Sequence, residues 1–200
     1  MTENSSPSSP RVIVGISGAS GAAYAQSVLR QLTNAGAETH LIISKAGRLT
    51  AHYEMGENFE FGPATAQYGI NDVGAPVASG SFRTAGMIIT PCSVRTMSEI
   101  ATGVTSTLLT RAADVCLKER RPLVLMVRET PFHLGHLRTM TQLAEMGAII
   151  APPLPALYAE PQSVNDIVDQ SSARCIELLG LTVSGTRRWG EHMGPVDYDT

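Results

Sequence analysis

The stretch Arg11–Ile16 (RVIVGI), followed by the turn Ser17–Gly21 (SGASG), decides the fold. The first part is a short run rich in β-branched residues, which is typical of a buried strand. Ala22–Leu32 follows the turn with apolar residues at helical spacing. A buried strand, a Gly/Ser turn and a helix in this order predict the first unit of a parallel sheet covered by helices.

The same alternation continues along the chain. Further strands are expected at Thr39–Ile43, Gly86–Thr90, Pro122–Val127 and Ala148–Ala151, and further helices at Leu108–Lys118, Leu137–Met146 and Val164–Leu179. This pattern predicts an α/β fold, a single Rossmann-like, doubly wound domain with a mostly parallel sheet. We expect that domain at 11–185, between a disordered tail at 1–10 and a C-terminal tail at 186–200. Thr50–Ser79 is poorly periodic and is interpreted as a long, functional loop.

Composition excludes several classes of protein. The chain has 200 residues, of which 16% are charged, and a net charge of −3. Such a chain is not disordered, and it lacks the broad basic surface of a typical nucleic-acid binder. No run of about 18 apolar residues is present, so no membrane span is expected. The three separated cysteines indicate a reducing, cytoplasmic protein, and the low charge content suggests surface hidden between subunits.

Hydroxyl-rich turns follow three of the predicted strands. Gly18, Ala19 and Ser20 follow the first, Ser44 follows the second, and Ser93–Thr96 (SVRT) follows the third. Each turn taken singly fits a tight turn or a helix cap that binds nothing. Carboxyl ends of parallel strands meet at one edge, however, where helix N-termini hold phosphates. Three such turns together favour a phosphorylated ligand.

Charged residues follow the fourth strand and line the helix before it. Arg128 and Glu129 come directly after the strand and are expected at the rim where ligands bind. Arg111, Asp114 and Lys118 share one helical face, where Asp114 could hold both cations in an ion-pair ladder. The alternative for Lys118 is a favourable positive charge at a helix C-terminus.

Three residues near the C-terminus admit two interpretations each. Tyr158 ends a stiff Pro-rich loop, which either holds it over a site or turns it toward the core. Arg174 shares a helical face with apolar residues and is either partly covered or a snorkelling surface side chain. Trp189, the only tryptophan, is either an anchor on another subunit or a lid on a ligand.

Metal and thiol chemistry have weak support in this sequence. His133 and His136 are three residues apart, but no third ligand stands at a suitable spacing, so no metal site is expected. Cys92 follows a strand without a histidine at short range and is interpreted as a buried thiol.

Several segments together carry a family resemblance. GISGASG, TPCSVRTMSEIATG, LLTRAADVCLKERRPLVLMVRETPFHLGHL and PPLPALY resemble the UbiX-type flavin prenyltransferases, over roughly Arg11 to Trp189. This family belongs to a wider group of flavoproteins that includes phosphopantothenoylcysteine decarboxylases. Those carry a PASANT-like segment and a catalytic histidine. The corresponding segment here, Pro91–Thr96 (PCSVRT), favours the prenyltransferase branch.

The resemblance implies a specific reaction. Such enzymes join the five-carbon unit of dimethylallyl phosphate to N5 and C6 of reduced FMN, without a metal. The prenylated FMN then serves a UbiD-type decarboxylase, and the enzyme assembles as a homododecamer. Whether the donor is a mono- or a diphosphate stays open.

The resemblance also implies roles for individual residues. The flavin-binding positions are Gly18, Ala19, Ser20, Ser44, Ser93, Val94, Arg95, Thr96 and Arg128. The prenyl phosphate is assigned to Tyr158, Arg174, Lys118 and Arg111, and the catalytic group to Ser20, Glu129, Lys118, Glu54 and Trp189. Glu54 is expected to reach in from a neighbouring subunit, and Glu129 to exchange a proton.

Two rival functions remain open at this stage. One is an FMN-dependent decarboxylase of the wider group, which would need a histidine facing the flavin. The other is a non-catalytic flavin carrier serving a decarboxylase. A carrier would need the flavin loops but not Lys118, Glu129, Tyr158 and Arg174 together.

Overall fold

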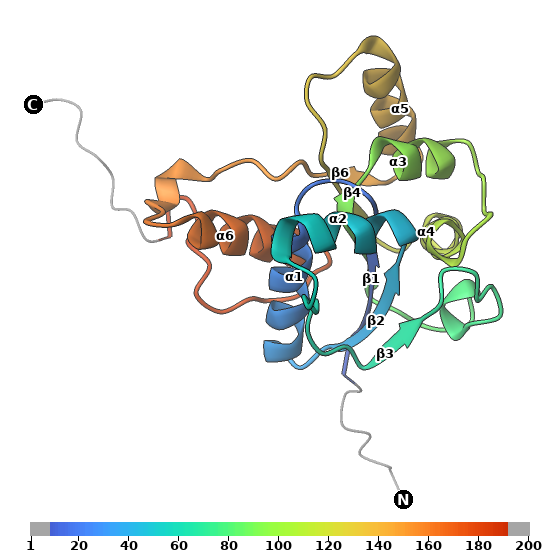
Figure 1. The fold of residues 1–200 in the computed structure, drawn as a ribbon, viewed down its shortest axis with the longest axis horizontal. Helices are drawn as coiled ribbons and strands as arrows, with labels where there is room; N and C mark the ends of the chain where they lie inside the picture. Colours follow the sequence, from blue (N-terminus) through green and yellow to red (C-terminus); the bar gives the residue numbers. More distant parts are fainter. Residues whose placement is uncertain (1–8, 192–200) are drawn as a thin grey trace, which may run out of the picture.

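A six-stranded sheet forms the centre of the molecule, in the computed structural model that describes residues 9–191 (Figure 1). The strands are β1 (Arg11–Ile16), β2 (Glu38–Ile43), β3 (Ala66–Tyr68), β4 (Gly86–Cys92), β5 (Leu123–Val127) and β6 (Ile149–Ile150). Their order is β3-β2-β1-β4-β5-β6, and all neighbours pair in parallel. The chain winds outward in opposite directions from β1 and β4, and ligands of such sheets bind at this reversal. The predicted fold class is confirmed.

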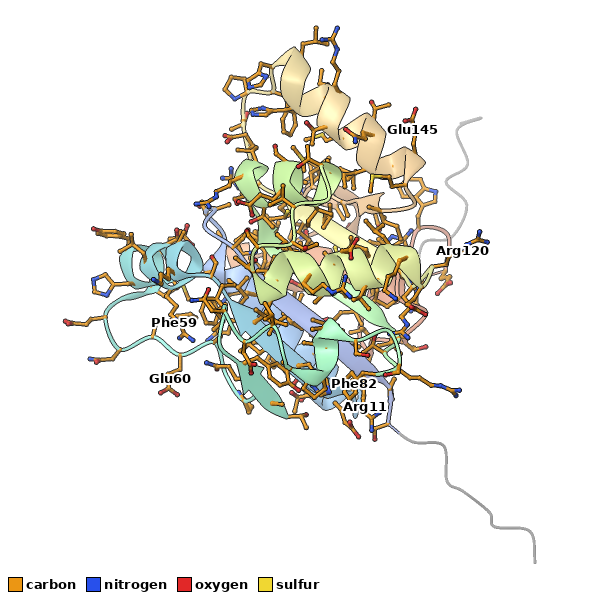
Figure 2. The ribbon with its side chains drawn as sticks, turned by 90° about the vertical axis from the view of Figure 1, so that its right-hand side faces the viewer. Arg11, Phe59, Glu60, Phe82, Arg120 and Glu145 are labelled. Atoms are coloured by element: carbon orange, nitrogen blue, oxygen red, sulfur yellow. The ribbon has the colours of Figure 1, made fainter. Side chains whose placement is uncertain are left out.

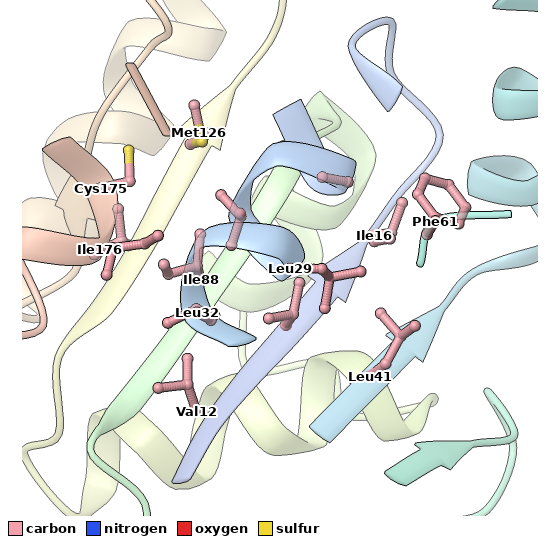
Figure 3. Close-up of a cluster of buried hydrophobic side chains, with 14 of the residues drawn as sticks. Val12, Ile16, Leu29, Leu32, Leu41, Phe61, Ile88, Met126, Cys175 and Ile176 are labelled. Atoms are coloured by element: carbon pink, nitrogen blue, oxygen red, sulfur yellow. The ribbon is translucent and has the colours of Figure 1, made fainter. Parts of the chain in front are cut away.

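Helices cover both faces of the sheet (Figure 1). One face packs against α1 (Ala22–Asn34) and α6 (Val164–Glu177), and the other against α3 (Val94–Ala101), α4 (Leu108–Lys118) and α5 (Leu134–Glu145). The alternation of side chains along β1 divides the core, because successive residues of a strand point to opposite faces. Val12 and Ile16 join Leu29 on the first face (Figure 3), whereas Ile13 joins Met87 on the second.

The central strands are buried on both faces, which explains their continuous apolar runs. Every residue of β4 and β5 is buried. A sheet covered on both sides leaves no solvent-facing row of side chains, so the apolar and polar alternation of a half-exposed strand is absent. This is why the strand predictions from apolar runs were close to the observed bounds.

The structure corrects the interpretation of Thr50–Ser79 as a loop. This segment contains the end of α2 (Lys45–Met55), the edge strand β3 and the short 3₁₀ helix η1 (Pro76–Ala78). Only Gly47 and Ala51 of α2 are buried, so no apolar stripe marked it as a helix. β3 has three residues, none of them fully buried, which is too short for a periodic signal.

Two further bounds differ from the prediction. Helix α5 begins at Leu134 rather than Leu137, because His133 caps it through Nδ1, which accepts from the N–H groups of Gly135 and His136. Histidine is not among the residues that usually signal a helix start. The last strand, β6, is shorter than the apolar run around it.

The expected tails lie partly outside the described residues, which exclude 1–8 and 192–200. Within the described part, the C-terminal segment contacts the domain. Arg187 donates through Nη1 to the carbonyl oxygen of Ala159 at 3.1 Å, and Arg188 donates through Nε to Glu177 at 3.1 Å. In the described range, no helix combines the length and apolar character needed to cross a membrane.

Candidate active site

A cavity of about 430 Å³ opens at the carboxyl edge of the sheet, where the loops after β1, β2 and β4 meet. It brings together many of the residues predicted to bind flavin. Those on its wall are Gly18, Ser44, Ser93, Val94, Arg95 and Thr96. Loops far apart in the sequence therefore form one site because parallel strands deliver their carboxyl ends to one edge.

Close backbone packing joins the first two loops. A Cβ added to Gly18 would lie 2.3 Å from the Cβ of Ala46, so the loops touch where glycine leaves room. The N–H of Ser44 donates to the carbonyl oxygen of Ile16 at 2.9 Å. These contacts fix the start of α2 against the end of β1.

Ser44 and Ser93 both cap helices, as the simpler interpretation of these turns expected. The Oγ of Ser44 accepts from the N–H of Gly47 at 2.9 Å, and that of Ser93 accepts from the N–H of Thr96 at 3.3 Å. Capping satisfies only part of a helix N-terminus, because four N–H groups there lack helical partners. Two helix starts, α2 and α3, thus face one cavity, which suits a phosphate.

Glu54 occupies the N-terminus of α1. Its carboxylate accepts from the N–H of Gly21 at 2.9 Å and of Ala22 at 2.8 Å, and it is hydrogen-bonded by the Ser20 side chain. Burial raises its pKa, but these hydrogen bonds and the charge of Arg128 outweigh burial, so the net pKa lies below the ordinary value. The first N–H groups of α1 are therefore already occupied by Glu54, whereas the starts of α2 and α3 line the cavity.

The carboxylate of Glu54 contacts the first loop of its own chain. Its expected role as a visitor to a neighbouring subunit stays a prediction. Helix α2 delivers Glu54, a helix that the sequence interpretation did not recognise beyond its first residues.

Arg128 and Glu129 lie at the end of β5, at the predicted rim. The backbone N–H of Arg128 donates to the carbonyl oxygen of Cys92 at 3.0 Å, which ties the end of β5 to the end of β4. The Oε1 of Glu129 accepts from the N–H of Thr130 at 2.9 Å. Burial raises the pKa of Tyr24 on α1, and the charge of Arg128 opposes that rise, which shows that Tyr24 also borders this cluster.

Lys118 and Arg111 lie elsewhere. Lys118 ends α4 at the amino-terminal edge of the sheet, close to Gly80 and paired with Glu119. Arg121 marks the same edge, where it donates to the carbonyl oxygen of Phe82 at 2.7 Å. In Figure 2, Arg120 marks the C-terminal end of α4, and Arg11 lies with Phe82 at the start of the sheet. Within one chain, Lys118 is therefore at the edge opposite Arg128.

Of the two ion pairs predicted for Asp114 on α4, the pair with Arg111 is present and the pair with Lys118 is not. Arg111 donates through Nη1 to Asp114 at 2.7 Å, as expected for an i, i+3 pair. Lys118 pairs with its neighbour Glu119 instead of Asp114. Arg111 also donates through Nε to the carbonyl oxygen of Ala78 at 3.2 Å, so η1 holds this side chain along α4.

Tyr158 and Trp189 lie together. Their rings meet edge to face with centroids 5.5 Å apart, so the described part of the C-terminal segment covers the 3₁₀ turn that carries Tyr158. Trp189 is 73% exposed, which leaves most of its surface free to contact something outside the chain. Arg174 is an exposed side chain on α6 and lies 3.9 Å from Glu177, which fits the snorkelling alternative within a single chain.

The sequence interpretation missed part of the cavity wall. Thr107 and Thr110 form a capping box at the start of α4 and line the cavity, as do Ile70 and Asn71. The T-x-x-T spacing before an apolar run was a visible signal for the first pair. Ile70 and Asn71 sit in the segment interpreted as a loop, where no pattern assigned them.

The remaining titratable groups have other surroundings. Burial raises the pKa of Cys92 to about 12, as expected of a buried thiol. His133 and His136 stack on each other with ring centroids 3.6 Å apart. Across residues 9–191, no three His, Cys, Asp or Glu side chains gather as a metal site would require.

Comparison with known proteins agrees with a nucleotide-type cavity on a doubly wound sheet. The flavoprotein family model matches residues 1–176. The flavin prenyltransferase UbiX of Thauera aromatica is 51% identical over 181 residues, covering 90% of this chain and 93% of that protein.

Solved structures agree in fold. A crystal structure of AnUbiX (PadA1) in complex with FMN and dimethylallyl pyrophosphate has a TM-score of 0.86 and 42% identity, covering 90% of this chain and 97% of that one. A dodecameric FMN-dependent UbiX-like decarboxylase from Escherichia coli O157:H7 has a TM-score of 0.80 and 40% identity, covering 90% and 98%. The chain belongs to the flavoprotein family and, within it, to the UbiX flavin prenyltransferases.

Proposed function

We propose that this protein is a flavin prenyltransferase that joins the dimethylallyl group of dimethylallyl phosphate to N5 and C6 of reduced FMN. The observation that carries the proposal is the cavity at the carboxyl edge, built from the hydroxyl-rich loops that the family resemblance assigns to flavin. The 42% identical structure that contains FMN and dimethylallyl pyrophosphate supports both substrates.

The cavity fits a flavin nucleotide in its chemistry. The starts of α2 and α3, with the hydroxyls of Ser44, Ser93 and Thr96, suit a phosphate and polar ribityl groups. Ile70, Val94 and Leu109 supply apolar wall. These residues would hold FMN at the carboxyl edge of the sheet, the edge at which β5 ends before Arg128 and Glu129.

The residues at the rim supply proton transfer. Reduced flavin, when bound, supplies the nucleophilic N5 and C6. Attachment at N5 releases a proton, and Glu129 is the carboxylate placed to accept it, held by the N–H of Thr130. Ser20, which hydrogen-bonds Glu54 in the first loop, is the proposed relay between the two carboxylates.

The leaving phosphate requires cations, because charge develops on it as the allylic bond breaks. Arg174 is a proposed ligand of the phosphate, with Tyr158 and Trp189 offering ring faces to the electron-poor allyl group. Lys118 lies at the opposite edge of the chain, and Arg111, in the first turn of α4, is paired with Asp114. We propose that a second subunit is needed to bring both cations to one phosphate. The dodecameric relative supports an assembly in which this is possible.

The two rival functions have less support. A flavin-dependent decarboxylase of the wider group would present a histidine to the flavin, yet among the described residues no histidine lines the cavity. His40 is buried beside Tyr68 on the strands β2 and β3, and His52 is exposed on α2. A passive carrier would need no proton-transfer carboxylate at the rim.

A mass spectrum of the flavin tests the proposal. The protein is incubated anaerobically with reduced FMN and dimethylallyl phosphate, and the extracted flavin is expected to gain one five-carbon unit. Parallel incubation with the diphosphate decides which donor is used. Unmodified FMN with both donors would contradict the function, whereas absence of bound FMN would contradict the flavin site itself.

We further propose that the product serves a UbiD-type decarboxylase in the cytoplasm. The family membership supports this partner. The test mixes the prenylated product with an apo-decarboxylase and measures whether decarboxylation begins. A decarboxylase that stays inactive with verified prenylated FMN would contradict the partnership.

A further inference from the structure

Ser17 is a buried serine that stands between the end of β1 and the predicted flavin loop. Its residue surface is 1% exposed. Its Oγ donates to the carbonyl oxygen of Pro91 at 3.0 Å and accepts from the N–H of Ser93 at 2.8 Å. Its own N–H also donates to the carbonyl oxygen of Pro91, at 3.2 Å.

These bonds connect two loops of the cavity. Ser17 bonds to Pro91 near the end of β4 and to Ser93, the residue that directly follows β4, and no other described residue of the first loop makes a recorded hydrogen bond to either. The hydroxyl donates one hydrogen bond and accepts one, and the side chain is buried away from solvent. Ser17 thus holds the protein together at this point rather than binding a ligand.

The loop that Ser17 fixes carries the third part of the cavity wall. Ser93 starts α3, its Oγ accepts from the N–H of Thr96, and both residues line the cavity. Displacement of Ser93 would therefore shift the start of α3 relative to Gly18 on the facing wall. A cavity whose walls are already in place binds more tightly than one that must be ordered on binding.

We propose that Ser17 is a positioning residue for flavin binding, which locks the loop after β4 onto the loop after β1. This inference rests on the proposed flavin site. It assigns a role to Ser17, the buried serine of the SGASG turn. Without the hydroxyl, the N–H of Ser93 loses its partner and the carbonyl oxygen of Pro91 keeps only the backbone N–H of Ser17, so the two segments gain freedom.

Three variants test this role by titration with FMN, followed by fluorescence. Ser17→Ala is expected to weaken FMN binding about tenfold, corresponding to ~1.4 kcal/mol. Ser17→Thr keeps the hydroxyl and is expected to restore most of the affinity. Ser27→Ala is the matched control, since Ser27 is 2% exposed, donates to Asp169 at 2.6 Å and accepts from Gln31 at 2.9 Å, but lies outside the cavity.

Thermal unfolding without FMN separates positioning from general stability. Ser17→Ala and Ser27→Ala are expected to lose similar stability, while only the first loses FMN affinity. Amide hydrogen exchange gives a second readout, which remains available even if Ser17→Thr does not fold. The N–H of Ser93 is expected to exchange faster in Ser17→Ala, and the N–H of Gly47, capped by Ser44, is expected to be unchanged.

Each result bears on one proposal. Equal FMN affinity in Ser17→Ala and the parent would overturn the positioning role and leave the flavin site intact. Equal loss in Ser17→Ala and Ser27→Ala would overturn it as well, because the effect would then be general destabilisation. A parent protein that binds no FMN would instead contradict the proposed function.

Discussion

The carboxyl edge of the sheet and the C-terminal end of α4 carry the two halves of the predicted active site, and they are built differently. At the carboxyl edge, Ser17 and Gly18 fix three loops to one another through buried hydrogen bonds and close backbone contact. At the end of α4, Lys118 is an exposed side chain paired only with its neighbour Glu119.

This difference separates what one chain completes from what assembly must complete. The carboxyl-edge cavity forms from loops that parallel strands bring together, so a single chain contains it. The cations expected at the leaving phosphate, Lys118 and Arg111, lie on a helix that runs away from that edge, because α4 connects the carboxyl end of one strand to the amino end of the next. We therefore expect flavin binding and prenyl transfer to respond differently to substitution.

The largest effect is expected at Glu129. Glu129→Gln keeps the size and the acceptor oxygen that binds the N–H of Thr130, but it cannot exchange a proton. We expect FMN binding to be nearly unchanged and prenylation to slow by about a hundredfold or more. Anaerobic stopped-flow absorbance of the flavin measures the rate. Prenylated flavin formed at the parent rate would show that Glu129 is only an ion-pair partner.

Lys118 tests the role of a second subunit. Lys118→Ala is expected to raise KM for the prenyl phosphate by about tenfold or more, with a smaller fall in kcat, because a cation that binds the phosphate throughout is lost. Co-assembly of Lys118→Ala with Glu129→Gln is expected to recover part of the activity, since some sites would then receive both intact residues. Mixed assemblies no more active than either variant alone would place Lys118 and Glu129 in the same chain's site.

Gly18 tests the contact between the first two loops. Gly18→Ala places a Cβ 2.3 Å from that of Ala46 and is expected to cost ~1–3 kcal/mol of stability and to weaken FMN binding. The double variant Gly18→Ala with Ala46→Gly restores the space, so it is expected to recover FMN binding. Chemical denaturation and FMN titration measure the two effects. Recovery in neither measurement would mean that the glycine is needed for another reason.

The smallest effect is expected at His40, far from the carboxyl-edge cavity. Burial lowers its pKa, Glu38 opposes that shift, and Arg11 adds to it, so the folded protein favours the neutral ring. Its stabilising contribution is therefore complete above pH ~6.5, the ordinary value, and is lost as the pH falls below that value. His40→Asn, which retains a polar group for the hydrogen bond with the Tyr68 hydroxyl, should flatten the dependence of stability on pH.

His52→Asn provides the control for that measurement, because His52 is exposed on α2. Denaturant unfolding is followed between pH ~7 and ~5 for the parent and both variants. An unchanged slope in His40→Asn would show that this buried histidine does not couple folding to protonation.

The sequence predicted the parts of the fold that follow from local pattern. The strands β1, β4 and β5 are continuous apolar runs because both faces of the sheet are covered, and α4 was predicted with its observed bounds, Leu108–Lys118. Weakly patterned elements escaped prediction. Helix α2 starts with a serine cap but has only two buried residues, both small, so it lacks an apolar stripe, and α5 starts with a histidine cap, which is not a usual start signal.

The sequence by itself determined the fold class, the family and which hydroxyl-rich loops meet at the carboxyl edge, because strand ends are readable from apolar runs and Gly/Ser turns. Only the tertiary structure decided which residues share a site. Glu54 reaches its own first loop because α2 carries it there, and Lys118 is separated from Arg128 because α4 spans the sheet from edge to edge. The spacing of residues along the sequence does not reveal such distances. They depend on how helices pack against a sheet whose strands come from distant parts of the sequence.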